Sequence, residues 1–260
     1  MIVTTTARPD ETTVQKALRL AREFGARYVE RRNRSLAELG RTYGTDRIAV
    51  VGFSEIRVLS GQSPPLFFHP SMAYLRVKRL RNGEGDALVD VSGVQPGDAV
   101  LDCTAGLGAD AIVFAYAVGE RGRVTALEVS PVVHAVVREG LASYVSGDAD
   151  VDAAMRRIET QRADYTDVLA RLPDKSYDIV YFDPMFRNPV LSSAAIAPLR
   201  PFAEERPLAE TDVRQAVRVA RKRVVLKNRR ESGEFQRLGF TVARQSSSPI
   251  AYGVIECDGT

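Results

Sequence analysis

The stretch Val100-Leu-Asp-Cys-Thr-Ala-Gly-Leu-Gly-Ala-Asp110 decides the fold class of this chain. An apolar run leads directly into two closely spaced glycines, Gly106 and Gly108, and apolar residues at helical spacing follow. A strand, a tight glycine turn and a helix in this order let the backbone approach a ligand where a Cβ atom would collide. The stretch therefore predicts a nucleoside-binding turn at the carboxyl end of a strand.

Two classes of cofactor suit this turn. A G-x-G-x-x-A spacing that starts at Gly106 also fits the relaxed dinucleotide fingerprint, and Glu128 lies where an acid that binds ribose hydroxyls is expected. Asp102 and Asp110 flank the glycines, so their charge repels a pyrophosphate but attracts the amino group and sulfonium of S-adenosylmethionine. The charges favour S-adenosylmethionine over NAD.

From residue 94 onward, apolar strands alternate with amphipathic helices, which is typical of a mainly parallel sheet covered on both faces. The predicted strands are Ala99–Cys103, Arg123–Val129, Ile158–Ala163, Tyr177–Asp183 and Arg223–Lys227. One helix is expected at Asp148–Arg157, before the third strand, and Thr211 is expected to cap the helix before the fifth.

The end of the chain departs from this alternation. Phe240–Arg244 and Tyr252–Glu256 read as strands separated by serine and proline without a helix, so a terminal antiparallel hairpin is expected. Five parallel strands followed by a hairpin describe the Rossmann-like sheet of class I methyltransferases better than a dinucleotide-binding sheet with two matching halves. The predicted fold class is α/β.

The first part of the chain reads as a small α/β domain. The predicted elements are strands at 2–6, 27–30, 47–51 and 56–59, a helix at 10–24 and a second helix capped by Ser35. Gly61–Pro65 is expected to break the pattern, Leu66–Pro70 to be extended, and Ser71 to open a basic helix. We place a domain boundary near residue 85, with residues 1–85 suited to substrate recognition and residues 86–260 forming the methyltransferase domain.

Composition excludes several classes of protein. With 260 residues and 45% apolar content the chain can bury a core, and no run approaches the roughly 18 apolar residues of a membrane span. No basic-then-apolar signal pattern is present at the start, so a cytoplasmic protein without a membrane partner is expected. Two cysteines and two histidines offer little support for a metal site, so no metal is expected.

The charge is distributed unevenly. Residues 1–85 hold 15 Lys/Arg against 8 Asp/Glu, residues 86–213 hold 11 against 21, and residues 214–260 hold 10 against 4. Basic ends suggest a polyanion such as RNA, and Arg79 and Arg81 on a short basic helix are candidate contacts; solvated charge on helix faces is the alternative. Arg76 and Lys78 are expected to reach solvent with them. Half of the eight basic residues in 214–230 are expected on a phosphate-facing surface.

A second motif, Tyr177-Asp-Ile-Val-Tyr-Phe-Asp-Pro-Met-Phe186, ends the predicted fourth strand. Ligands bind at this edge of open α/β sheets. The lone pair of an aromatic amine is delocalised into its ring, and the Asp183 carboxylate with the Pro184 carbonyl can hold the two amine hydrogens so that the nitrogen becomes nucleophilic. Phe186 can stack on the base. The alternative is an ordinary turn, since Asp-Pro is a common turn opener.

These two motifs, with Lys222–Asn228 and Arg76–Asp86, resemble the J-type small-subunit ribosomal RNA guanine-N2 methyltransferases over roughly residues 66–235. The resemblance implies a class I fold and S-adenosylmethionine contacts at Ala109, Asp110, Glu128, Val129, Asp164, Tyr165 and Asp183. The front module of residues 1–60 and the exit Arg187-Asn-Pro depart from the family pattern, which bears on the substrate more than on the reaction.

We therefore expect an S-adenosylmethionine-dependent methyltransferase that acts on the exocyclic amine of guanine in ribosomal RNA. The alternatives are a methyltransferase for a small molecule or protein, an NAD-dependent oxidoreductase and a non-catalytic RNA-binding protein. The predicted catalytic residues are Asp183, Pro184 and Phe186, and the predicted substrate contacts are Met185, Lys227, Arg79 and Arg81. The predicted cofactor contacts are Asp102, Thr104, Gly106, Gly108, Ala109, Asp110, Glu128, Val129, Asp164, Tyr165 and Asp183.

Overall fold

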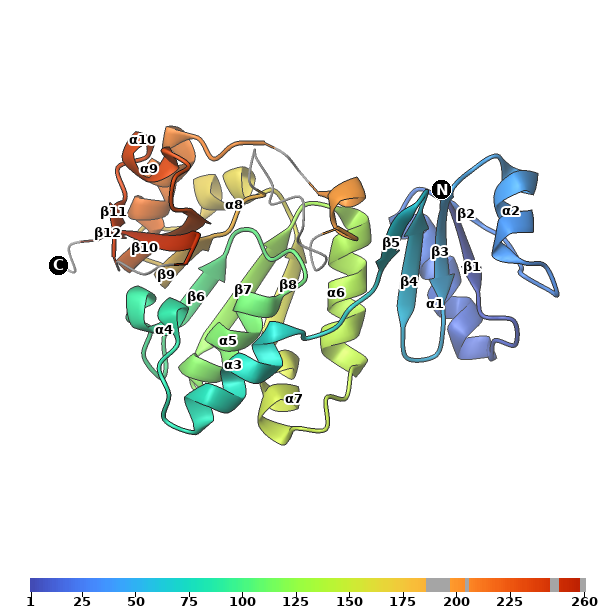
Figure 1. The fold of residues 1–260 in the computed structure, drawn as a ribbon, viewed down its shortest axis with the longest axis horizontal. Coiled ribbons are helices and arrows are strands. Elements are labelled where there is room, and N and C mark those ends of the chain that lie inside the picture. Colours follow the sequence, from blue (N-terminus) through green and yellow to red (C-terminus); the bar gives the residue numbers. More distant parts are fainter. Residues whose placement is uncertain (186–196, 204–205, 244–247, 258–260) are drawn as a thin grey trace. The chain divides into compact units, whose positions relative to one another are not determined.

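The structure is a computed structural model that describes residues 1–185, 197–203, 206–243 and 248–257. It contains a five-stranded and a seven-stranded sheet (Figure 1). The two sheets belong to different compact units. The N-terminal unit comprises residues 1–69, 130–144 and 197–203, and the described remainder of the chain forms the second unit, called here the catalytic unit. The domain division near residue 85 stays a prediction.

The sheet of the N-terminal unit has the order β2-β1-β3-β4-β5. Its strands are β1 (Ile2–Thr5), β2 (Arg27–Tyr28), β3 (Arg47–Val51), β4 (Ile56–Ser60) and β5 (Ser63–Leu66). Its helices are α1 (Glu11–Glu23), α2 (Leu36–Tyr43), α6 (Pro131–Ser143) and the 3₁₀ turn η1 (Arg200–Phe202). The Ser35 hydroxyl accepts a hydrogen bond from the Glu38 N–H and caps α2, as the sequence predicts.

The prediction that Gly61–Pro65 breaks the strand pattern is wrong. Strand β5 begins at Ser63, contains Pro64 and Pro65, and pairs antiparallel with β4. Because β5 is the last strand of the sheet, its prolines can occupy positions that need no N–H donor. The stretch Leu66–Pro70 contributes only Leu66 to a strand.

The sheet of the catalytic unit has the order β11-β12-β10-β9-β6-β7-β8. Its strands are β6 (Ala99–Asp102), β7 (Arg123–Glu128), β8 (Ile158–Arg162), β9 (Tyr177–Phe182), β10 (Ala220–Arg229), β11 (Thr241–Val242) and β12 (Ile250–Glu256). Strands β8, β7, β6, β9 and β10 run parallel, while β12 pairs antiparallel with β10 and with β11. This confirms the predicted parallel sheet with its terminal antiparallel hairpin.

The helices of the catalytic unit cover both faces of this sheet. They are α3 (Met72–Arg81), α4 (Ala87–Ser92), α5 (Ala109–Val118), α7 (Ala149–Arg156), α8 (Tyr165–Arg171), α9 (Glu210–Val219) and α10 (Glu234–Arg237). On one face, Leu101 and Phe182 are buried in a core cluster with Leu169 of α8 and Val213 of α9. On the opposite face α5 lies against the sheet, and α3, α4 and α7 pack against α5.

Two helix starts differ from expectation. Helix α9 begins at Glu210 rather than after Thr211, and the Asp212 carboxylate accepts a hydrogen bond from the Ala209 N–H instead of a threonine cap. Helix α4 adds to the predicted elements, and it starts where the Asp86 carboxylate accepts from the N–H groups of Leu88 and Val89. Among the described residues, no helix has the length and apolar character that crossing a membrane requires.

Candidate functional site

The glycine turn connects β6 to α5 at the carboxyl edge of the sheet. Gly106 and Gly108 have φ angles of 50° and 79°, in the left-handed region where residues with a Cβ are strained. The Gly108 N–H donates to the Ala105 carbonyl at 2.7 Å, and Ala109 begins the helix. Strand β6 has β7 as its neighbour on one side and β9 on the other, so the strand order changes direction at β6. Ligands bind at such a point in open α/β sheets.

Thr104 connects the ends of the two central strands. Its hydroxyl accepts a hydrogen bond of 2.6 Å from the N–H of Asp183, the residue that follows β9. Its own N–H donates to the carboxylate of Asp102 at 3.0 Å. The Asp102 side chain is buried, and Asp183 retains 28% of its side-chain exposure. Of these two acids, Asp183 is the one that a substrate can reach.

Lys227, from β10, bridges two of the predicted site acids. Its ammonium nitrogen lies 2.7 Å from Asp183 Oδ2 and 2.9 Å from Asp110 Oδ2. The Tyr181 hydroxyl donates to the same Asp110 oxygen at 2.7 Å. Three predicted residues that are far apart in the chain, Asp110, Asp183 and Lys227, are therefore brought together.

Arg76, from α3, completes this charge cluster. Its guanidinium binds Asp86 with two hydrogen bonds of 2.7 and 2.8 Å and donates a further one to Asp110. Only 16% of its side chain is exposed, so the expectation that Arg76 reaches solvent is wrong. A guanidinium can serve two carboxylates because its donors form a rigid fork.

The surroundings of the cluster set the ionisation of its acids. Burial raises the pKa of Asp102 to about 8, and the charges of Asp110 and Asp183 act in the same direction. Burial also opposes ionisation of Asp110, but Lys227 and Arg76 outweigh it and hold the pKa of Asp110 below its ordinary value. For Asp183, burial outweighs Lys227, and its pKa lies above the ordinary value. Asp183 is thus the more readily protonated member of the bridged pair.

A second group of predicted residues follows β7 and β8. The Glu128 carboxylate accepts a hydrogen bond of 3.2 Å from the Gly106 N–H, which holds this acid against the glycine turn. Val129 is exposed. Asp164 caps α8 through the Thr166 N–H and also pairs with Arg206 at 2.8 Å.

The Tyr165 ring lies edge-on to Phe182, with ring centroids 5.5 Å apart, and the Arg206 guanidinium lies 4.9 Å from the Tyr165 centroid. Arg206 therefore contacts both Asp164 and Tyr165, which are predicted cofactor contacts. After Asp183, Pro184 and Met185 are half-buried at the same sheet edge. Phe186, predicted to stack on the base, lies outside the described residues.

The basic segments are more neutralised than the sequence suggests. Arg81 pairs with Asp148 at 3.0 Å and with Asp150 at 3.1 Å, whereas Arg79 is exposed and forms no ion pair within the described part of the chain. In residues 214–230, most basic side chains meet acids instead of facing phosphate together. These pairs are Arg214–Glu210, Arg218–Asp174, Arg221–Asp178, Lys222–Asp98 and Arg223–Glu256, besides the Lys227 bridge.

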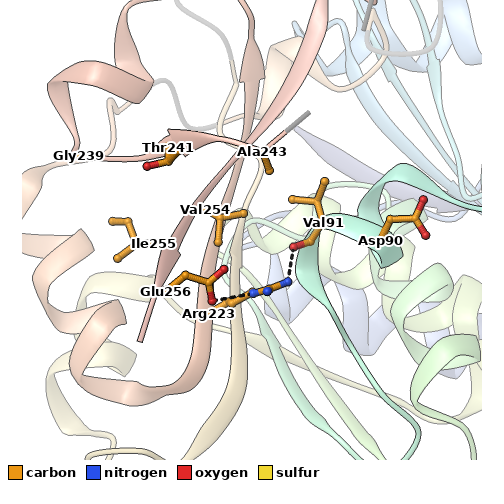
Figure 2. Close-up of a pocket in the computed structure, with 9 residues that line it drawn as sticks. All are labelled: Asp90, Val91, Arg223, Gly239, Thr241, Ala243, Val254, Ile255 and Glu256. Carbon is orange, nitrogen blue, oxygen red and sulfur yellow. Dashed lines mark hydrogen bonds and ion pairs between the residues drawn. The ribbon is translucent and has the colours of Figure 1, made fainter. Parts of the chain in front are cut away.

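A hollow elsewhere in the catalytic unit contains none of the predicted site residues. Figure 2 shows its lining, in which Arg223 donates to the carboxylate of Glu256 at 2.8 Å and to the carbonyl of Val91 at 3.0 Å. Arg223 lies four residues before Lys227 on β10, away from the carboxyl edge. The charge of Arg223 is already paired with Glu256, and the lining of the hollow contains no residue of the charge cluster.

Sequence reasoning missed four members of the cluster's surroundings: Arg76, Asp86, Tyr181 and Tyr252. Tyr252 lies opposite Lys227 in the β10–β12 register, and burial together with Asp110 raises its pKa to about 12. The predicted hairpin could have placed Tyr252 near the site, because cross-strand partners share a sheet face. Nothing in the local sequence marks Arg76 as different from its exposed neighbour Arg79.

The sheet order, with its antiparallel last strands, defines the class I methyltransferases as the structural class of the catalytic unit. Residues 67–239 match the family described as "Putative SAM-dependent methyltransferase", and the chain belongs to this family of S-adenosylmethionine-dependent methyltransferases. The chain is 41% identical to the uncharacterized protein YpiP of Bacillus subtilis (strain 168) over 255 residues, which are 98% of this chain and 99% of that protein.

Two further proteins are similar to this chain, one in sequence and one in fold. The chain is 30% identical to ribosomal RNA small subunit methyltransferase J of Stutzerimonas stutzeri (strain A1501) over 187 residues, covering 68% of this chain and 70% of that protein. The crystal structure of the SAM-dependent methyltransferase NGO1261 from Neisseria gonorrhoeae aligns with a TM-score of 0.65 and 18% identity. The alignment covers 100% of this chain and 97% of that chain, so the two proteins share the same fold.

The residues at the sheet edge fit S-adenosylmethionine. Among the described residues of the cluster, the acids Asp86, Asp110 and Asp183 outnumber the cations Arg76 and Lys227. With these three acids ionised the cluster is net negative even when Asp102 is protonated, so it attracts a cationic ligand. The left-handed glycines form a tight turn in which Gly106 is half-buried, and Glu128 is held beside it. The cofactor, when bound, supplies a methyl group that its sulfonium makes electrophilic.

Replacing Arg76 with methionine should lower the free energy of unfolding by about 3 to 5 kcal/mol, because Asp86 loses its cation and Asp110 loses one of its two. Arg79→Met, on the same helix but exposed, is the control and should change stability by less than about 0.5 kcal/mol. Urea unfolding of both variants measures the difference. Equal stabilities would mean that the Arg76 pairs contribute no more than surface ion pairs.

Replacing Glu128 with alanine should weaken binding of S-adenosylhomocysteine at least about tenfold, since this acid is predicted to bind the ribose hydroxyls through a charge-assisted contact. Glu159→Ala changes an exposed acid on β8 and should leave the affinity unchanged. Calorimetric titration gives both affinities, and thermal unfolding checks that the Gly106 turn survives. Parent-like affinity of the Glu128 variant would remove this acid from the cofactor site.

Proposed function

We propose that this methyltransferase acts on the exocyclic amine of guanine in small-subunit ribosomal RNA. The observation that carries the proposal is the Asp183 carboxylate: it follows β9 at the ligand-binding edge, shares Lys227 with the buried Asp110, and is still 28% exposed. The relatives named ribosomal RNA small subunit methyltransferase J support the choice of substrate. An RNA of the ribosome implies that the protein works in the cytoplasm.

The proposed chemistry uses Asp183 and Pro184 as hydrogen-bond acceptors. An aromatic amine becomes nucleophilic when its nitrogen turns tetrahedral, and two acceptors favour that geometry by binding its two hydrogens. Lys227 contacts Oδ2 of Asp183, and the Thr104 hydroxyl contacts its backbone N–H. Among the described residues, none forms a hydrogen bond with Oδ1. One carboxylate oxygen is therefore available for the substrate, next to the half-buried Pro184.

Asp183 also suits the proton that must leave. The methylated nitrogen carries a positive charge until it loses one of its hydrogens, and the nearest proposed acceptor is Asp183. Its raised pKa brings it closer to neutral pH than an exposed aspartate, which improves proton acceptance. Much of the rate acceleration should come from alignment of the amine with the methyl group.

RNA binding is proposed to depend on few basic residues. Arg79 on α3 is exposed and outside the ion pairs of the described residues, so it is the better of the two predicted phosphate contacts. Arg81 is held by Asp148 and Asp150 and would have to leave them. Lys227 is engaged with two carboxylates, so a role in direct substrate contact is less suitable for it than for Met185.

The test is methyl transfer to purified small ribosomal subunits that lack the modification, with isotope-labelled S-adenosylmethionine and nucleoside analysis of the product. Asp183→Ala should lower turnover by about 100-fold or more, because the interaction is strongest in the transition state. Affinity for RNA should stay near that of the parent. Because Asp183 is also a predicted cofactor contact, S-adenosylhomocysteine binding is measured on the same variant to separate the two effects. Asp167→Ala, an exposed aspartate of α8, is the control.

Two outcomes would contradict this proposal separately. Near-parent transfer to the same nucleotide by Asp183→Ala would remove Asp183 from the chemistry. Transfer by the parent to a small molecule or a protein, with none to RNA, would overturn the substrate and leave the methyltransferase assignment intact. N2-methylguanosine in the digested RNA is the product that the proposal requires.

A further inference from the structure

Lys227 is held from two sides, which distinguishes it from a lysine that reaches for a ligand. Its ammonium contacts Asp183 Oδ2 at 2.7 Å and Asp110 Oδ2 at 2.9 Å, and 23% of its side chain is exposed. Asp110 is itself fixed by Arg76 and by the Tyr181 hydroxyl. The ammonium therefore has a defined position, and through it one oxygen of Asp183 has a defined position.

The charged groups that face Asp183 indicate that the contact with Lys227 also affects the ionisation of Asp183. Among the described residues these groups are Lys227 of β10, Asp110 of α5, Asp102 of β6, Arg76 of α3 and Tyr181 of β9, and Tyr252 of β12 lies opposite Lys227. Asp110 is held ionised and opposes a charge on Asp183. Lys227 is the cation in direct contact with Asp183, so Lys227 opposes the effect of Asp110 most strongly.

We propose that Lys227 is a positioning residue, which fixes Oδ2 of Asp183 and keeps this carboxylate ionised. Oδ1 can then accept a hydrogen bond from the substrate amine. This inference rests on the proposed role of Asp183 in methyl transfer. It replaces the expectation that Lys227 contacts the substrate. Lys227 acts through Asp183 and touches neither reacting atom.

The contact geometry supports this assignment over direct phosphate binding. A phosphate ligand of Lys227 would compete with two carboxylates already within hydrogen-bond distance. Lys222, on the same strand, has 43% of its side chain exposed and pairs with Asp98 at the other end of β10. It provides a matched lysine that lies outside the charge cluster.

The test is the titration of Asp183 itself, followed by carboxyl carbon NMR on protein labelled in aspartate, with Asp183→Asn used to assign the signal. Lys227→Met should raise the pKa of Asp183 by at least about one pH unit, because an opposite charge in contact is lost while the negative charge of Asp110 remains. Lys227→Arg, which keeps the charge, should change it by much less, and Lys222→Met should leave it at the parent value.

Activity gives a second readout. With removal of Lys227, the acid limb of the pH–rate profile should move to higher pH by the same shift, with kcat lowered at neutral pH and KM for RNA nearly unchanged. An unchanged pKa of Asp183 in Lys227→Met would overturn the proposal. A raised KM with an unmoved acid limb would also overturn it, since Lys227 would then bind substrate directly.

The NMR titration requires no substrate, so it distinguishes failure of this inference from failure of the RNA assignment. Urea unfolding verifies that each variant is folded before it is titrated. If Lys227→Met does not fold, Lys227→Gln retains N–H donors without the charge and must show the same upward shift. Absence of the shift in a folded Lys227→Gln variant would contradict the proposal equally.

Discussion

The structure of the site depends on the pairing of Asp110 with Lys227 and Arg76. One buried carboxylate receives a cation from β10, a cation from α3 and the hydroxyl of Tyr181 from β9. Removing water from a charge is costly, and only a complete set of partners offsets that cost. Because the partners come from three elements, the ion pairs also determine where those elements meet at the sheet edge.

The hydrophobic core makes this polar edge possible. Leu101, Val180 and Leu226 are fully buried in the middle of β6, β9 and β10, so these strands keep a common register. Their carboxyl ends then project Asp102, Asp183 and Lys227 from one edge. The acidic surplus left there after pairing agrees with the cationic cofactor of the family. The raised pKa of Asp183 follows mainly from burial of this carboxylate, and the charge of Asp110 acts in the same direction.

The sequence predicted the parts of the fold that depend on local patterns. The glycine turn, the parallel strands and the terminal hairpin follow from residue spacing alone. It failed where tertiary contacts decide: Pro64 and Pro65 sit in an edge strand, and Arg76 is buried while Arg79 is exposed on one helix. The charge counts of the three sequence segments did not predict which basic side chains can meet phosphate, since those near the end of the chain pair largely with acids distant in sequence.

The central claim is that an acid-rich sheet edge makes this glycine turn a site for S-adenosylmethionine and not for a dinucleotide. Calorimetric titration of the unmodified protein with S-adenosylhomocysteine and with NAD, at equal ionic strength, tests it most directly. We expect saturable binding of S-adenosylhomocysteine and no measurable heat with NAD. Tighter binding of NAD would contradict it.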